Sequence, residues 1–78
     1  MKVIFFGKLA DSISRQIDFD LAVPFTIGEL RAQLDRAFPG RGLADGRVRA
    51  CVDGVIVSDD ATLAGEQPVE ILAPVSGG

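Results

Sequence analysis

Hydrophobic and polar residues follow different periods along this chain, and each period predicts a different element. Residues 2–6 (Lys-Val-Ile-Phe-Phe) are rich in β-branched and aromatic side chains and predict a strand that is apolar on both faces. In residues 15–21, Ile17, Phe19 and Leu21 alternate with polar residues, which predicts a half-buried strand. The two strands are expected to be antiparallel if the segment between them turns back.

One helix is predicted in the middle of the chain. Thr26 and Glu29 have the spacing of a capping box, in which the N-cap hydroxyl and a carboxylate three residues later satisfy free backbone amides. Behind this signal, apolar residues recur at helical spacing: Ile27, Leu30, Leu34 and Phe38. The charged residues between them, including Arg31, are expected on the polar side of the helix. Pro39-Gly40 is expected to end it.

A third strand is predicted at residues 48–52, it continues at residues 55–57 on the far side of a turn, and a last strand is predicted at residues 69–72. Asp53-Gly54 is a hairpin signal between the first two of these segments, and residues 62–65 are expected to be a short connection. The resulting class is α+β, a mixed sheet with one main helix, and its ββαββ order is that of the β-grasp, or ubiquitin-like, fold. Residues 1–73 are expected to form this domain and residues 74–78 a flexible C-terminal Gly-Gly tail.

Composition narrows the classes of function. A chain of 78 residues builds one small domain with little room for an enclosed catalytic cleft. Cys51 is the single cysteine and histidine is absent, which excludes an internal disulfide, a multi-cysteine metal site and histidine-based catalysis. No apolar run has the length of a membrane span, so the cytoplasm is the expected location, with no membrane partner.

The net charge of −3 and the scattered basic residues argue against nucleic acid as a partner. A mildly acidic carrier could instead dock on enzymes with basic surfaces, although the charge alone favours this weakly.

Few side chains of this sequence are candidates for catalysis, metal binding or phosphate binding. Asp59-Asp60 is interpreted as a solvated turn or a cap, because a metal site would need further oxygen ligands nearby. The glycine-rich stretch 40–46 lacks the ending of a phosphate-binding loop and precedes a strand, so a plain loop is expected. Cys51 lies mid-strand and is expected to be an inert buried thiol, with a reactive sulfur relay as the alternative. No metal site is predicted.

The C-terminal residues Gly77 and Gly78 are the remaining candidate. Glycine has no Cβ, so the backbone can enter a narrow channel and approach a nucleotide phosphate closely. The segment after Ala73 can reach about 16 Å when extended. Pro74 has no amide donor and would stop the last strand from pairing further. A frayed terminus of small residues is the alternative interpretation.

Several segments resemble the small subunit of molybdopterin synthase, a ubiquitin-like sulfur-carrier family. The similar segments span most of the chain: 2–11 (Lys-Val-Ile-Phe-Phe-Gly-Lys-Leu-Ala-Asp), 26–30 (Thr-Ile-Gly-Glu-Leu), 51–58 (Cys-Val-Asp-Gly-Val-Ile-Val-Ser), 63–66 (Leu-Ala-Gly-Glu) and 73–78 (Ala-Pro-Val-Ser-Gly-Gly). The Phe-Phe opening together with the Pro-Val-Ser-Gly-Gly ending is the most specific part. The segment 11–15 is shorter than is usual in the family.

The resemblance implies a carrier that is not catalytic alone. An ATP-dependent adenylyltransferase of the ubiquitin-activating type would adenylate the Gly78 carboxylate, and a persulfide would convert it into a thiocarboxylate. The tail residues Gly77, Ser76, Val75 and Pro74 would carry it into the large catalytic subunit of molybdopterin synthase. There the sulfur would pass to a cyclic pyranopterin phosphate in molybdenum cofactor biosynthesis. The chain would bind no cofactor, and the activating enzyme would consume the ATP.

Phe6, Ile56 and Leu72 are candidates for a partner interface. One helix can cover only one face of the sheet, and alternation places these residues opposite the inward ones. By resemblance they correspond to the contact surface for the large subunit. Three other functions stay open: a sulfur carrier for thiamine or another metabolite, a ubiquitin-like protein modifier, and a non-covalent interaction module.

Overall fold

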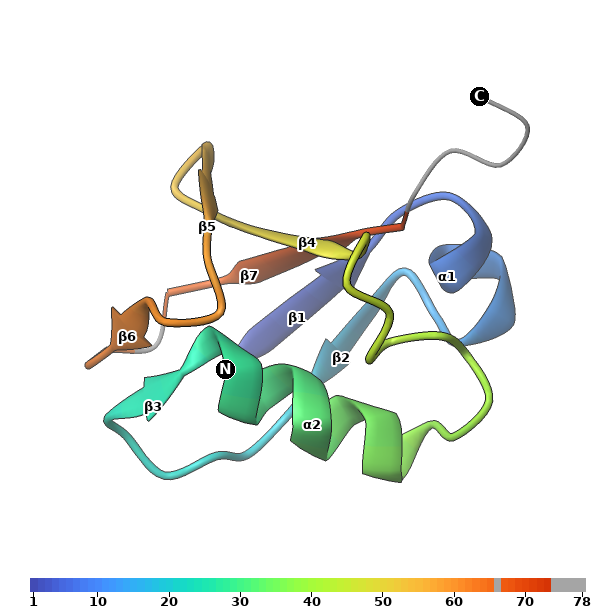
Figure 1. Cartoon of the computed structure of the whole chain (residues 1–78). Helices are drawn as coiled ribbons and strands as arrows, with labels where there is room; N and C mark the ends of the chain where they lie inside the picture. The colour runs from blue at the N-terminus through green and yellow to red at the C-terminus, as the bar shows by residue number, and fades with distance from the viewer. Residues whose placement is uncertain (66, 74–78) are drawn as a thin grey trace.

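A five-stranded mixed sheet lies across one main helix in the computed structural model, which describes residues 1–65 and 67–73 (Figure 1). The elements are β1 (Lys2–Phe5), α1 (Lys8–Ser12), β2 (Gln16–Asp18), β3 (Phe25–Thr26), α2 (Ile27–Ala37), β4 (Arg49–Val52), β5 (Val55–Val57), β6 (Thr62–Leu63) and β7 (Val69–Leu72). The strand order is β2-β1-β7-β4-β5. The central pair β1 and β7 is parallel, and the other pairs are antiparallel. The α+β β-grasp prediction is therefore confirmed.

The core lies between the sheet and α2. Val3 and Phe5 of β1 and Val69 and Ile71 of β7 point toward the helix and are almost completely buried. Leu34 of α2 meets them from below, with no exposed surface. Strand residues alternate between the two faces, so the residues between these buried ones point away from the helix.

Helix α2 begins where its capping signal predicts. The Thr26 hydroxyl accepts a hydrogen bond from the Glu29 amide at 3.1 Å, which satisfies a free donor of the first turn. The helix ends at Ala37, directly before the C-cap residue Phe38 and the predicted stop at Pro39-Gly40.

The hairpin between β4 and β5 also forms as predicted. Asp53 and Gly54 both have positive φ, 52° and 79°, as the two central residues of a type I′ turn require. This turn holds β5 at the edge of the sheet, where β4 is its one partner among the described strands.

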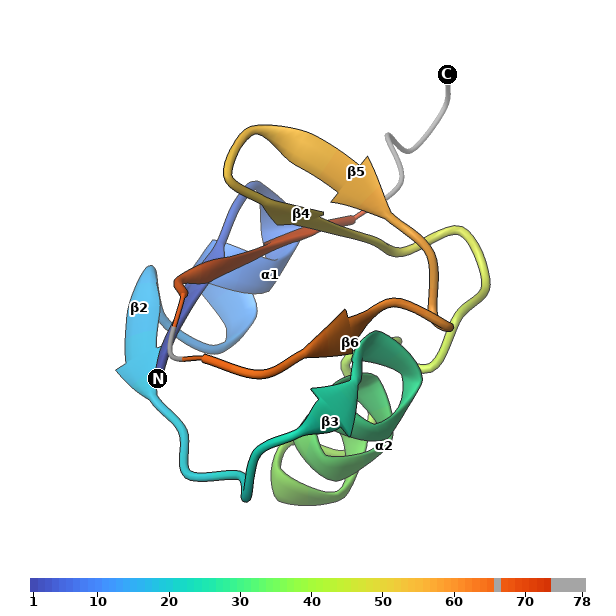
Figure 2. The same cartoon turned by 90° about the vertical axis from the view of Figure 1, so that its left-hand side faces the viewer.

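Three elements were not predicted. Helix α1 lies between β1 and β2 and buries Leu9, and the two-residue strands β3 and β6 form a separate small sheet beside the start of α2 (Figure 2). The expected connection at 62–65 therefore contains strand β6. The strand expected over 15–21 is shorter, because only 16–18 pair with β1, although Ile17, Phe19 and Leu21 still pack against the core.

The expected tail, residues 74–78, lies outside the described residues. In the part of the chain that the structure describes, no helix is long and apolar enough to cross a membrane.

Candidate functional site

The face of the sheet turned away from α2 carries an apolar surface. Pairing in register puts four of its residues in one row across β1, β7, β4 and β5: Ile4, Glu70, Cys51 and Ile56. With the neighbouring residues Phe6 and Leu72, these six side chains make up what we call the outer sheet face. No helix among residues 1–65 and 67–73 lies over this face (Figure 1).

The three residues predicted as an interface are placed together on this surface. The side chains of Phe6 and Ile56 are 45% and 62% exposed, and Leu72 is half-buried. All three side chains are therefore at least partly open to water on this face, and their role as a partner interface stays a prediction.

Cys51 belongs to the same surface, and the expectation of a buried thiol is wrong. It is half-buried, because β4 turns Ala50 and Val52 toward the core and Cys51 away from it. Its cross-strand neighbours are Glu70 and Ile56.

The chain leaves the sheet at one defined end. Because β1 and β7 are parallel, Phe6 and Ala73 emerge at the same end of the sheet. The antiparallel strand β4 starts there, with Arg49 opposite Leu72. We call this the exit end. The predicted reactive group, Gly78, and the tail residues Pro74, Val75, Ser76 and Gly77 follow it and lie outside the described residues.

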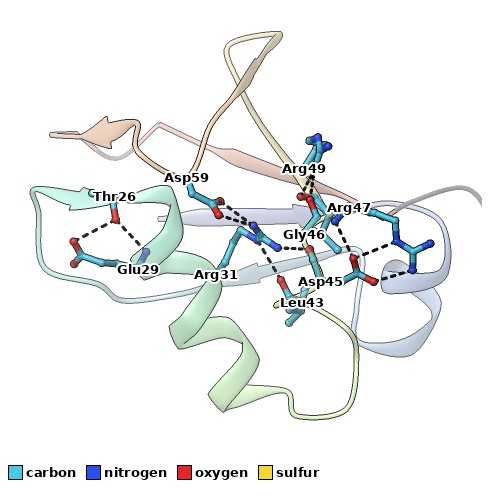
Figure 3. A network of polar contacts seen from close by, with 10 residues as sticks. Thr26, Glu29, Arg31, Leu43, Asp45, Gly46, Arg47, Arg49 and Asp59 are labelled. Carbon is cyan, nitrogen blue, oxygen red and sulfur yellow. Dashed lines mark hydrogen bonds and ion pairs between the residues drawn. The ribbon is translucent and has the colours of Figure 1, made fainter.

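A buried arginine organises the loop that leads into β4 (Figure 3). Arg31 contacts both carboxylate oxygens of Asp59, at 2.8 and 2.9 Å, through its Nη1 atom. Its Nε donates to the carbonyl of Leu43 at 3.2 Å, and its Nη2 donates to the carbonyl of Asp45. Arg31 is 7% exposed, so the expectation that it lies on the polar side of α2 is wrong. These contacts join helix α2, the 40–46 loop and the segment after β5.

The other ion pair of the described residues lies on the surface of the same loop. The Asp45 carboxylate accepts hydrogen bonds from the Arg47 amide at 2.8 Å and from its Nη2 at 2.9 Å. These hydrogen bonds hold the pKa of Asp45 at about 2, below its usual value of 3.8. The 40–46 stretch is thus a loop whose backbone is held by contacts with Arg31 and whose Asp45 pairs with Arg47.

The described residues hold no group of three or more histidine, cysteine, aspartate or glutamate side chains that could bind a metal ion. Asp59 serves the ion pair with Arg31, a contact that its sequence position did not signal.

Comparisons with known proteins identify a matching family and solved structures with the same fold. A model described as the ThiS family matches residues 3–78. The crystal structure of SAMP1 from Haloferax volcanii is similar with a TM-score of 0.79 and 23% identity, over 99% of this chain and 97% of that one. Another crystal structure, of H. volcanii small archaeal modifier protein 1, has a TM-score of 0.76 and 19% identity, over 95% of each chain. No curated protein sequence matches this chain.

Proposed function

The chain belongs to the ThiS family of ubiquitin-like proteins, and from that premise we propose that it is the sulfur-carrying small subunit of molybdopterin synthase. The family match runs through Gly78, and the resemblance of the Phe5-Phe6 and Pro74–Gly78 segments supports this carrier among others.

One observation of the structure carries the proposal: the outer sheet face adjoins the exit end. Leu72 belongs to that face and is followed directly by Ala73, where the chain leaves β7. A partner that covers Phe6, Ile56 and Leu72 therefore receives the last residues of the chain beside its own surface. This arrangement suits a protein that presents a terminal group to another protein's active site.

The chemistry proposed at Gly78 proceeds through activation and exchange. The carboxylate attacks the α-phosphate of ATP, which forms an acyl-adenylate and releases pyrophosphate. A persulfide of the sulfur donor attacks the acyl carbon and displaces AMP, leaving an acyl disulfide. A second thiol then cleaves the S–S bond, which frees the thiocarboxylate and leaves a disulfide on the donor. Adenylation is needed because a free carboxylate is a poor electrophile.

Each partner has a separate task in this scheme. An ATP-dependent adenylyltransferase of the ubiquitin-activating type charges Gly78 and binds the nucleotide, so this chain itself holds no cofactor. The large subunit of molybdopterin synthase then transfers the sulfur to a cyclic pyranopterin phosphate. Gly77 keeps the segment narrow, and Pro74, Val75 and Ser76 provide reach. The reaction is proposed to occur in the cytoplasm.

Intact mass measurement tests the carrier function. The purified chain is incubated with ATP, a sulfur source and the activating enzyme of the same organism. The expected product is heavier by the exchange of one oxygen for one sulfur, and a variant lacking Gly78 stays unchanged. An unchanged mass of the chain that retains Gly78 would refute the proposal. Formation of molybdopterin after addition of the large subunit and the pterin precursor then separates this pathway from a thiamine carrier.

A second candidate is a ubiquitin-like protein modifier. It is favoured by the fold of the small archaeal modifier protein, which this chain shares over 95% or more of its length. In that case Gly78 forms an isopeptide bond with a lysine of a target protein. Higher-mass conjugates in cells that disappear when Gly78 is deleted would support this function.

A further inference from the structure

Charge is distributed unevenly between the two ends of the sheet, although the chain as a whole is acidic. The exit end carries three cations, Lys8 of α1, Arg15 opposite Phe5 and Arg49 at the start of β4, together with one carboxylate, Asp11 of α1. At the opposite end, Asp18 lies at the end of β2 and Asp53 in the β4–β5 turn. Lys2 is also at that opposite end, paired in register with Asp18.

A pocket at the exit end collects further cations. It has a volume of about 340 Å³, and its wall includes Lys8 of α1, Arg41 and Arg47 of the loop before β4, and Ala73. Asp45 is the acidic residue in its wall, and it is engaged with Arg47. We call this the exit pocket.

Two of these cations are open to a partner. Lys8 and Arg41 are exposed, and neither forms an ion pair with any of the described residues. Arg41 makes one long contact within its own loop, 3.4 Å to the carbonyl of Pro39. Even with Arg47 neutralised by Asp45, the exit pocket keeps a net positive charge.

The loop that carries Arg41 and Arg47 is held in place from inside. Arg31 binds the carbonyls of Leu43 and Asp45, and Asp45 orients the Arg47 guanidinium (Figure 3). The loop is therefore held in place without a partner, and Arg47 is oriented by Asp45, so the loop needs little reordering on binding.

We propose that the exit pocket docks against a carboxylate-rich rim around the channel of the ATP-dependent activating enzyme, and this rests on the proposed carrier function. Any protein that admits the terminus must place its channel opening against the exit end, where Lys8 and Arg41 are exposed. A nucleotide joined to Gly78 is a poorer occupant, because five residues, if fully extended, would place that group about 16 Å from Ala73. The net negative charge of the whole chain favours partners with basic surfaces. The positive charge of the exit pocket instead favours a partner whose contacting surface is acidic.

Lys2 begins β1 and Lys8 begins α1, just after β1, so the two lysines lie at opposite ends of the sheet and allow a matched test. Lys8→Glu and Lys2→Glu change the net charge equally, and both side chains are exposed. With the ATP-dependent activating enzyme, Lys8→Glu is expected to raise the KM for this chain about tenfold with little change in kcat, because opposite charge steers association. Lys2→Glu should change KM less than about twofold. Arg41→Glu should behave like Lys8→Glu.

Ionic strength provides a second readout. The KM of the unmodified chain should rise between about 0.05 and 0.5 M salt, and this rise should be smaller for Lys8→Glu. Equal effects of the two lysine substitutions, or a lower KM for Lys8→Glu, would overturn the proposal. Saturable binding of AMP or inorganic phosphate to the free chain, lost in Lys8→Glu, would also overturn it in favour of a small-molecule site.

A failure of the proposed carrier function can be distinguished from a failure of the acidic-rim proposal. If Gly78 is not charged at all, affinity for the activating enzyme is measured by calorimetry without ATP. Weaker binding of Lys8→Glu than of Lys2→Glu then supports the acidic rim independently, and equal binding refutes it.

Discussion

The two faces of the sheet differ in how far their side chains are exposed, and two adjacent residues show the difference. Phe5 and Phe6 are neighbours at the end of β1, yet Phe5 is 2% exposed beneath the sheet and Phe6 is 45% exposed on the other side. The inner face is closed by α2, whereas no described helix closes the outer one. Phe5 therefore contributes to the core, whereas Phe6 stays open to water and is free for the proposed recognition of a partner.

The largest expected effect is on the inner face. Phe5→Ala should lower the free energy of unfolding by about 3–5 kcal/mol, because it removes a buried ring and leaves a cavity. That is comparable with the whole stability of a small domain. Urea denaturation measures the loss, and Phe6→Ala is the matched control, with an expected change within about 1 kcal/mol. Similar losses for the two variants would contradict the assignment of the faces.

A second prediction concerns the buried cation on the inner side. Arg31→Met should lower the free energy of unfolding by about 2–4 kcal/mol, because the carbonyls of Leu43 and Asp45 lose their donor. Asp59→Asn should cost only about 1 kcal/mol, because the Asp59 side chain is 56% exposed and water can replace it. Thermal and urea unfolding of both variants check the order. A larger loss for Asp59→Asn would show that the ion pair outweighs the carbonyl contacts.

These two predictions separate what local sequence could reveal from what it could not. The β4–β5 hairpin and the start of α2 depend on neighbouring residues, Asp53-Gly54 and Thr26 with Glu29, and both were predicted correctly. The burial of Arg31 depends on Asp59, 28 residues away, and on a loop that folds over the helix. No periodicity encodes such a contact.

The candidate site shows the same division. Alternation within strands placed Phe6, Ile56 and Leu72 on the outward side, because strand side chains have a fixed period of two. The exit pocket was missed because Lys8 and Arg41 come from segments that only the completed sheet brings together. Strands β3 and β6 were missed for a related reason, since two-residue strands are too short to show alternation.

A third prediction tests recognition on the outer face. Ile56→Ala should weaken binding to the proposed partner, the large subunit, about tenfold, since removal of an apolar interface contact can cost more than about 1 kcal/mol in binding. Its free energy of unfolding should change by less than about 1 kcal/mol. Val23→Ala is the control, because Val23 is 49% exposed and lies in the connection between β2 and β3, outside the strands of the five-stranded sheet. Calorimetric titration compares the three chains, and equal affinities would remove Ile56 from the interface.

The smallest expected effect comes from removing the exposed ion pair between Asp45 and Arg47, in contrast to the buried contacts of Arg31. The hydrogen bonds from Arg47 lower the pKa of Asp45 from 3.8 to about 2 in the folded state. A carboxyl group with a lowered folded-state pKa stabilises the fold fully above its unfolded pKa and loses this contribution as the pH falls through the folded value. The Tm advantage of the natural chain over Asp45→Asn should therefore be constant above about pH 5 and disappear toward about pH 2. Because the pair is exposed, the advantage should be small and should shrink in about 0.5 M salt. Thermal unfolding between about pH 2 and 6 at two salt concentrations checks this, and a difference independent of pH would show that the Asp45 charge does not stabilise the loop.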